Sequence, residues 1–204
     1  MIALLQLYPE HLNLNGDAGN LLVLQRRLEW GGVPVSRLDY RAGNTIEGRP
    51  DVVLVGHGSS EAWRQIYGDF AKLVPKLQEW MHSGTQVIAI ASGFAALHGL
   101  ADGLPSNVER ADRRSEFICE NFGESKLVGY LNSELQLPNL ATNGNLTGSM
   151  LHGLLLAKNS WLADILIEKI LPEGQQFEAA ENKFQFVQSL EIAAVNLAEE
   201  QAQN

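Results

Sequence analysis

Apolar residues follow two different patterns in the first half of the chain. Short runs of strand length, most of them nearly continuous in apolar residues, occur at residues 2–7, 33–39, 51–55 and 86–91. Between them lie stretches where apolar residues recur every three or four positions, at residues 20–30, 61–81 and 94–100. Apolar runs are typical of strands buried on both faces, and the wider spacing predicts helices. We therefore predict an α/β fold whose mostly parallel sheet carries helices on both faces.

Helix-breaking residues mark the ends of the two longer helices. Gly31-Gly32 follows the first helix and Ser83-Gly84 follows the second. Pro75 lies inside the second helical stretch and predicts a break there, because proline removes a backbone donor and crowds the preceding turn.

The second half of the chain is less regular. The pattern predicts short strands at residues 117–121 and 126–130, a loop over residues 135–148, and a helix over residues 160–170. Asn143-Gly144 marks a turn in that loop. Since there is no internal repeat and the length suits one unit, we predict a single domain over residues 1–204, with a helical tail that frays beyond about residue 195.

Charge and cysteine content narrow the function classes. The net charge is −9, and the nearest basic cluster, residues 109–114, is short and mixed in sign, so it predicts a solvated loop rather than a nucleic-acid surface. Cys119 is the single cysteine, which excludes an internal disulfide, fits a reducing compartment and is expected to be an inert core residue. The N-terminus lacks the basic region of a signal peptide, and no apolar run approaches the roughly 20 residues of a membrane span. We expect a cytoplasmic protein.

Two loops follow predicted strands at the edge where parallel sheets bind ligands. The segment I-A-I-A-S-G-F-A-A-L, residues 88–97, passes from strand to helix through a turn that contains Ser92. Such a turn can expose a nucleophile, but here it lacks both outer glycines of G-x-S-x-G, so a closely packed turn of small residues is the alternative. Residues 56–60, G-H-G-S-S, suit either an anion-binding loop or a glycine turn, and His57 suits either a base or a solvated side chain.

The remaining histidines give no sign of a metal site. His152 lies between apolar residues and a glycine, which is typical of a packed, hydrogen-bonded histidine. The five histidines show no metal-ligand spacing such as H-E-x-x-H. We expect neither a metal nor a cofactor.

Two long motifs resemble one known family. Residues 8–20 read Y-P-E-H-L-N-L-N-G-D-A-G-N and are followed by L-Q-R-R at residues 24–27. Residues 148–153 read G-S-M-L-H-G, with L-A-K-N and L-A-D following up to residue 164. Over residues 6–170 the chain resembles the GatD glutamine amidotransferases, in the cobyric-acid-synthase-like (CobB/CobQ-like) class I group. The resemblance implies a flavodoxin-like fold and a heterodimer with a Mur-ligase-like (MurT-like) subunit. It also implies a role in peptidoglycan synthesis, in which ammonia from glutamine amidates the D-glutamate of the lipid II stem peptide.

The same resemblance places the chemistry. The family motif I-C-G-G-Y-Q aligns with residues 90–95, so its nucleophilic cysteine becomes Ala91, and Ser92 stands one position late, where the family has glycine. His152 occupies the position of the catalytic base. The resemblance implies substrate-binding roles for Arg110, Gly56, Gly58 and Gly93.

Other family positions have changed as well. The family loop G-G-G-x-D-x-E-Q reads G-H-G-S-S-E-A-W at residues 56–63, so Trp63 replaces its glutamine, and Leu154 replaces the proline after the histidine motif. We therefore predict a pseudoenzyme that serves as a binding or regulatory subunit. The alternatives are an active amidohydrolase that uses Ser92, His57 or His152, and a module in which residues 56–60 bind glutamine or another small ligand.

The kept motif segments allow two interpretations. Residues 20–30, with Arg26 and Arg27, and residues 156–164 suit either a partner surface or core and capping positions.

Overall fold

A six-stranded sheet forms the centre of the computed structural model, which describes residues 1–100, 108–172, 177 and 181–202. The strand order is β2-β1-β3-β4-β8-β7, in which the first five strands are parallel and β7 runs antiparallel to β8. The strands are β1 (Ile2–Leu7), β2 (Val35–Tyr40), β3 (Val52–Val55), β4 (Gln86–Ile90), β7 (Leu140–Asn143) and β8 (Leu146–Ser149). The predicted mostly parallel α/β fold is confirmed.

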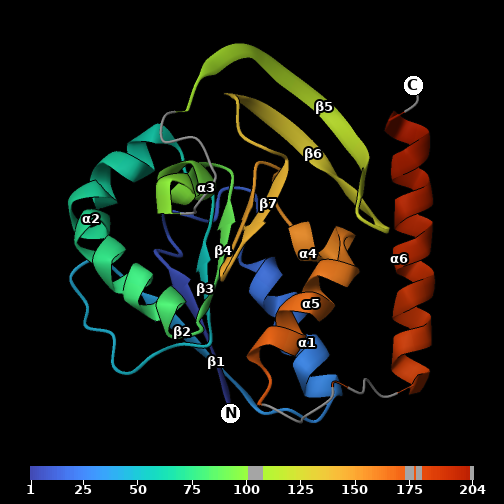
Figure 1. Ribbon diagram of the computed structural model, residues 1–204, viewed down its shortest axis with the longest axis horizontal. Helices are drawn as coiled ribbons and strands as arrows, with labels where there is room; N and C mark the ends of the chain where they lie inside the picture. Colours follow the sequence, from blue (N-terminus) through green and yellow to red (C-terminus); the bar gives the residue numbers. More distant parts are fainter. Residues whose placement is uncertain (101–107, 173–176, 178–180, 203–204) are drawn as a thin grey trace.

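Helices cover both faces of this sheet (Figure 1). One face carries α1 (Gly19–Trp30), α4 (Leu155–Lys158) and α5 (Ser160–Ile170), and the other carries α2 (Ser60–His82) and α3 (Ser92–Leu97). A short 3-10 turn, His98–Leu100, follows α3. Strands β3 and β4 are buried along their whole length because helices pack on both sides, which explains their continuous apolar runs.

Helix α2 corrects one prediction. It begins where the Ser59 side chain accepts a hydrogen bond from the Ala62 amide, and it runs without interruption to His82. The break predicted at Pro75 is wrong, because buried side chains on both sides of the proline, Phe70, Leu73 and Leu77 among them, hold the two halves on the sheet. One missing backbone donor does not outweigh that packing.

The second half holds more strand than its sequence pattern predicts. Strands β5 (Arg110–Phe122) and β6 (Ser125–Leu135) form a long antiparallel ribbon, and each is more than twice its predicted length. Residues 109–114 were predicted as a loop and mostly belong to β5, although their side chains are exposed as expected. The loop predicted over residues 135–148 is also wrong, since it contains β7 and β8, joined at the predicted Asn143-Gly144 turn. Backbone pairing, rather than an apolar pattern, defines these strands.

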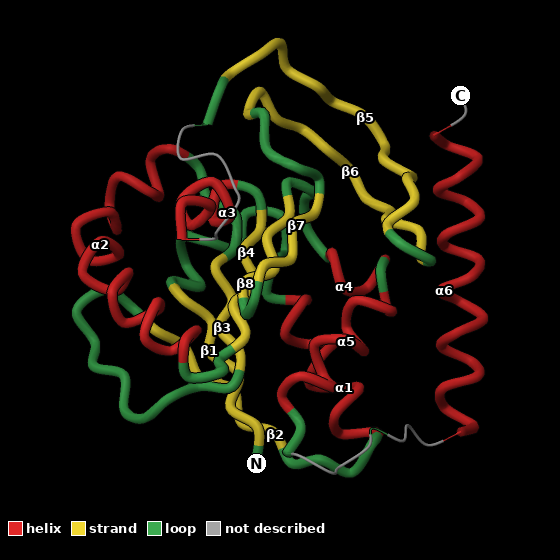
Figure 2. Tube along the Cα trace, viewed as in Figure 1, coloured by secondary structure: helices red, strands yellow, loops and turns green. Residues whose placement is uncertain are grey.

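The last helix, α6 (Glu181–Ala202), lies beside the β5–β6 ribbon and α4 (Figures 1 and 2). It is helical through the segment where fraying is predicted, up to Ala202. Cys119 is half-buried, with its Sγ 3.9 Å from Glu199 Oε1 of α6, so its predicted place in the core is wrong. Burial, followed by the Glu199 charge, raises the pKa of its thiol.

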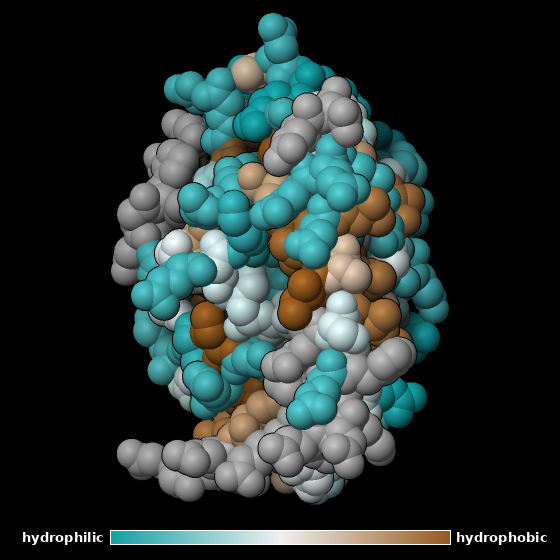
Figure 3. All heavy atoms as spheres, turned by 90° about the vertical axis from the view of Figure 1, so that its right-hand side faces the viewer, coloured by the Kyte–Doolittle hydropathy of each residue, from teal (hydrophilic) through white to brown (hydrophobic). Residues whose placement is uncertain are grey.

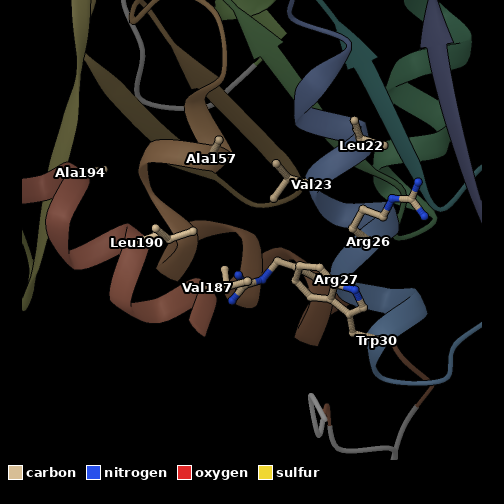
Figure 4. A pocket seen from close by; sticks show the side chains of 9 residues that line it. All are labelled: Leu22, Val23, Arg26, Arg27, Trp30, Ala157, Val187, Leu190 and Ala194. Atoms are coloured by element: carbon tan, nitrogen blue, oxygen red, sulfur yellow. The ribbon is translucent and has the colours of Figure 1, made fainter. Parts of the chain in front are cut away.

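The side of the molecule that carries α6 mixes apolar and polar surface (Figure 3). Leu190, Ile192 and Leu197 of α6 are more than half exposed there. An apolar cavity of about 450 Å³ lies between α1 and α6, with Leu22, Trp30 and Leu190 among its lining residues (Figure 4).

No helix in the part of the chain that the structure describes is long and apolar enough to cross a membrane.

Candidate functional site

Two loops meet beyond the carboxyl ends of β3 and β4. We call residues 56–59 the β3–α2 loop and residues 90–93 the elbow. Gly93 allows the close contact between them, because a β carbon there would collide with the Val55 carbonyl oxygen and would lie 2.7 Å from that of Gly56. Gly58 packs the β3–α2 loop against the segment before α1, where a β carbon would lie 2.7 Å from the His11 carbonyl oxygen. Gly56 is similarly confined by the Leu12 carbonyl oxygen. These three glycines therefore serve the backbone packing of the site, and their substrate-binding role stays a prediction.

Ala91 stands at the bend of the elbow in an unusual backbone conformation. Its φ is 48° and its ψ is −108°, a region that residues with a β carbon rarely adopt. The residue is 1% exposed, and its amide donates to the Ser149 carbonyl oxygen of β8 at 2.6 Å. Strand-to-helix bends of this kind are where elbow enzymes hold their nucleophile.

Ser92 points into the β3–α2 loop. Its Oγ accepts hydrogen bonds from the Gly58 amide at 2.9 Å and from Trp63 Nε1 at 2.7 Å. The hydroxyl donates to the Gly58 carbonyl oxygen at 3.1 Å, and His57 Nδ1 lies 2.9 Å from Oγ. A hydroxyl offers one proton and two lone pairs, so these contacts use all of them. Ser92 thus ties the elbow to the neighbouring loop.

His57 is part of this network and not the solvated loop residue that one interpretation of the sequence allowed. The Ser92 amide donates to its Nδ1 at 3.3 Å, and its own amide donates to Asp17 Oδ2 at 3.2 Å. Its ring packs edge-to-face with that of His152, with ring centroids 4.7 Å apart. Burial, together with the charge of His152, lowers the pKa of His57 to about 4, so the ring is neutral at pH 7.

His152 has both ring nitrogens engaged. Nε2 lies 3.1 Å from the Asn132 carbonyl oxygen and must carry the proton, because that oxygen only accepts. Nδ1 is then the acceptor for Asn15 Nδ2, at 2.6 Å. Burial lowers the pKa of His152, and the charges of Arg113 and Lys158 lower it further. The predicted hydrogen-bonded histidine is therefore what the structure places here.

Asp17 is a member of the site that sequence reasoning missed. It is fully buried, and Oδ1 has no hydrogen-bond partner among the described residues. Burial raises the pKa of Asp17 to about 6, against the opposing effect of backbone hydrogen bonds led by that from His57. Its position within the motif at residues 8–20 is the feature of the sequence that could have identified it.

Arg110 lies apart from this network. It is an exposed residue of β5 whose guanidinium pairs with Glu134 at 2.6 Å. Arg113 is the basic side chain of β5 that acts on His152, and it donates to Asn132 Oδ1 at 3.2 Å. The substrate-binding role of Arg110 stays a prediction.

The segments at residues 20–30 and 156–164 supply buried structural residues. The Arg27 side chain is 3% exposed and forms a bidentate pair with Asp164 of α5, with Nη2 2.6 Å and 2.7 Å from its two oxygens. Asn20 is fully buried, donates to the Gly153 carbonyl oxygen and accepts from the Leu156 amide. Of the two interpretations of these segments, the structure favours core and capping positions for these residues, while Arg26 is exposed.

The described residues contain no group of three or more side chains able to hold a metal ion.

Comparison with known proteins identifies the fold. The whole chain superposes on a glutamine amidotransferase from Thermotoga maritima with a TM-score of 0.54, covering 100% of this chain and 99% of that one. The fold is that of the flavodoxin-like glutamine amidotransferases. Sequence identity to this protein is 14%.

Two further solved structures share less of the architecture. PurLQS from Thermotoga maritima gives a TM-score of 0.42 at 15% identity, covering 74% of this chain and 87% of that chain. A putative protease I from Bacteroides thetaiotaomicron gives 0.43 at 10% identity, covering 81% and 98%. No protein-family model and no curated protein matches the sequence.

Proposed function

We propose that the chain is a GatD-like amidotransferase-family subunit that does not hydrolyse glutamine and instead binds or regulates a Mur-ligase-like partner in lipid II amidation. The observation that carries the proposal is Ala91 at the strained bend of the elbow. Glutamine hydrolysis at such a bend requires a thiolate, which attacks the carboxamide carbon and releases ammonia. A methyl group has no lone pair, so no acyl-enzyme forms at this position.

The neighbouring groups support the same proposal. All hydrogen-bonding capacity of Ser92 Oγ is used within the chain, which leaves no lone pair for attack. The accepting nitrogen of His152 is used by Asn15, so it holds no free site for a proton from a nucleophile. Both side chains would have to leave their partners before they acted as nucleophile and base.

One observation favours a second function, an amidohydrolase that uses Ser92. His57 Nδ1 lies 2.9 Å from Ser92 Oγ, which is the distance expected of a general base and its nucleophile. The Gly58 and Trp63 donors oppose this function, because they draw electron density from the oxygen that would have to attack.

The first experiment measures ammonia released from L-glutamine by the purified chain. We expect release at the rate of the protein-free blank. Clear turnover that is lost in His152→Ala, and kept in the exposed-histidine control His82→Ala, would show that the chain is an active enzyme. Turnover lost in Ser92→Ala would assign it to the second function.

The partner is tested separately. The resemblance of residues 8–27 and 148–164 to the GatD motifs motivates a Mur-ligase-like partner. We expect such a subunit to co-purify with the tagged full chain from its native cell. Recovery of the chain alone under conditions that preserve other amidotransferase complexes would argue against the heterodimer.

A further inference from the structure

The elbow carries the backbone donors that an acyl-transfer site would need. In elbow enzymes, the amide of the residue after the nucleophile and an amide from a neighbouring strand-to-helix loop stabilise the negative oxygen of the intermediate. The corresponding amides here are those of Ser92 and of His57 or Gly58 in the β3–α2 loop.

Each of these amides is already paired inside the chain. The Ser92 amide donates to His57 Nδ1 at 3.3 Å, and the Gly58 amide donates to Ser92 Oγ at 2.9 Å. The His57 amide donates to Asp17 Oδ2 at 3.2 Å. None of these three amides is therefore free to donate to a substrate oxygen.

We infer that His57 is an internal plug: its imidazole takes the place of a substrate carbonyl oxygen on the elbow amide and closes the site to glutamine. This inference rests on the proposed function, because it adds a second reason, apart from the missing thiol, why the site would not hydrolyse glutamine. The Nδ1 lone pair supplies the acceptor that a carboxamide oxygen would otherwise supply.

Three contacts hold the plug in place. The His57 ring packs edge-to-face on His152, its Nδ1 faces the Ser92 hydroxyl, and its backbone is fixed by buried Asp17. Ala91 is 1% exposed and directly precedes Ser92, whose amide and hydroxyl both contact the ring, so on this inference the His57 ring lies in the path to a side chain at position 91. A nucleophile restored at Ala91 is therefore still shielded from substrate.

The test compares cysteine variants in a Cys119→Ser background, so that the introduced thiol is the single one in the chain. The three proteins carry Ala91→Cys alone, Ala91→Cys with His57→Ala, or Ala91→Cys with His82→Ala. The probe is a glutamine analogue whose carboxamide is replaced by a diazoketone. The thiol proton goes to the diazo carbon, the sulfur bonds to that carbon, and dinitrogen leaves, so the protein gains a stable thioether that mass spectrometry detects.

We expect His57→Ala to speed labelling of Cys at position 91 at least tenfold, and His82→Ala to leave the rate unchanged. Thermal unfolding of each variant verifies that it is folded. Equal rates with and without His57, fast labelling of Ala91→Cys alone, or no labelling of the folded His57→Ala protein would each overturn the plug.

A second measurement needs no cysteine. We expect L-glutamine to bind His57→Ala in calorimetry at least tenfold more tightly than it binds the unaltered chain. Equal binding overturns the plug as well. These outcomes are distinct from failure of the proposed function, which shows as glutamine turnover by the unaltered chain.

Discussion

Replacing Ala91 by glycine tests whether the elbow stores strain. At φ 48° and ψ −108°, the Ala91 β carbon crowds its own backbone. Sparsely populated conformations of this kind cost about 1–3 kcal/mol, a cost that glycine largely avoids because it has no β carbon. The matched control is Ala89→Gly, two residues earlier in β4, where the alanine is equally buried in regular strand.

Apart from the backbone strain at position 91, the two substitutions have the same physical effects. Each loses one buried methyl group, worth about 0.8 kcal/mol, and each adds about 0.5–1 kcal/mol of chain entropy to the unfolded state. Ala89→Gly should therefore lower the free energy of unfolding by about 1–2 kcal/mol. Ala91→Gly recovers the strain and should be more stable than Ala89→Gly by about 1–3 kcal/mol, which places it near the unaltered chain or slightly above it.

Urea unfolding followed by circular dichroism measures this difference. Both variants should keep the slope of free energy against urea, so that the midpoints report stability alone. Equal losses in the two variants would refute the strain. A confirmed difference would support the proposal that the elbow keeps the geometry of a nucleophile position without holding a nucleophile.

Three further changes follow from the same contacts. Arg27→Met leaves a carboxylate on α5 without its buried partner and should cost about 2–3 kcal/mol in urea unfolding, because that carboxylate is partly screened by water; the exposed neighbour Arg26→Met should change stability by less than about 0.5 kcal/mol, and equal effects would contradict the structural role. Gly93→Ala drives a methyl group into the last carbonyl of β3 and should cost at least about 2 kcal/mol, whereas Gly68→Ala in α2, where a β carbon meets nothing within 4 Å, should stabilise by about 0.5–1 kcal/mol. The pKa of Asp17, raised to about 6, means that the folded state binds more protons than the unfolded state between about pH 6 and 4, so this group adds stability as the pH falls through that window. Asp17→Asn removes that gain. On going from pH 7 to pH 4, the variant should therefore lose about 2–3 kcal/mol of stability relative to the unaltered chain. Parallel profiles of stability against pH for the two proteins would contradict the burial argument.

The sequence pattern predicts the first half of the fold and fails where strands lack buried side chains. Strands β3 and β4 are apolar because both faces are covered, so their runs are visible in the sequence. Residues 110–114 of β5 are exposed and largely charged, and the segment is a strand whose backbone pairs with β6 at Arg110 and Arg114, with an irregular register between them. Their side-chain pattern does not predict that backbone pairing. The β7–β8 hairpin is hidden in the same way, apart from its Asn143-Gly144 turn.

The sequence predicts where the site lies but not which of its side chains contact one another. Strand-to-helix spacing places Ser92 and His57 at the ends of β4 and β3, and these strands are neighbours in the sheet. Their contact depends on how two loops approach each other, which Gly93 permits but does not specify. Each histidine, considered alone, is typical of an ordinary solvated or packed residue, and the paired rings appear only in three dimensions.

The residues that carry the GatD resemblance differ from those that would carry chemistry. Asn20 joins α1 to the segment after His152, and Arg27 joins α1 to α5. These motif residues are therefore needed for the stability of the fold. Such positions are kept whether or not the elbow is active, because their loss leaves buried polar groups unpaired. The resemblance therefore supports a shared scaffold. Whether the chain hydrolyses glutamine depends instead on Ala91 and on the partners of Ser92. A chain that keeps this fold for any purpose would retain the first set of residues and be free to change the second, and that division is compatible with the proposed pseudoenzyme.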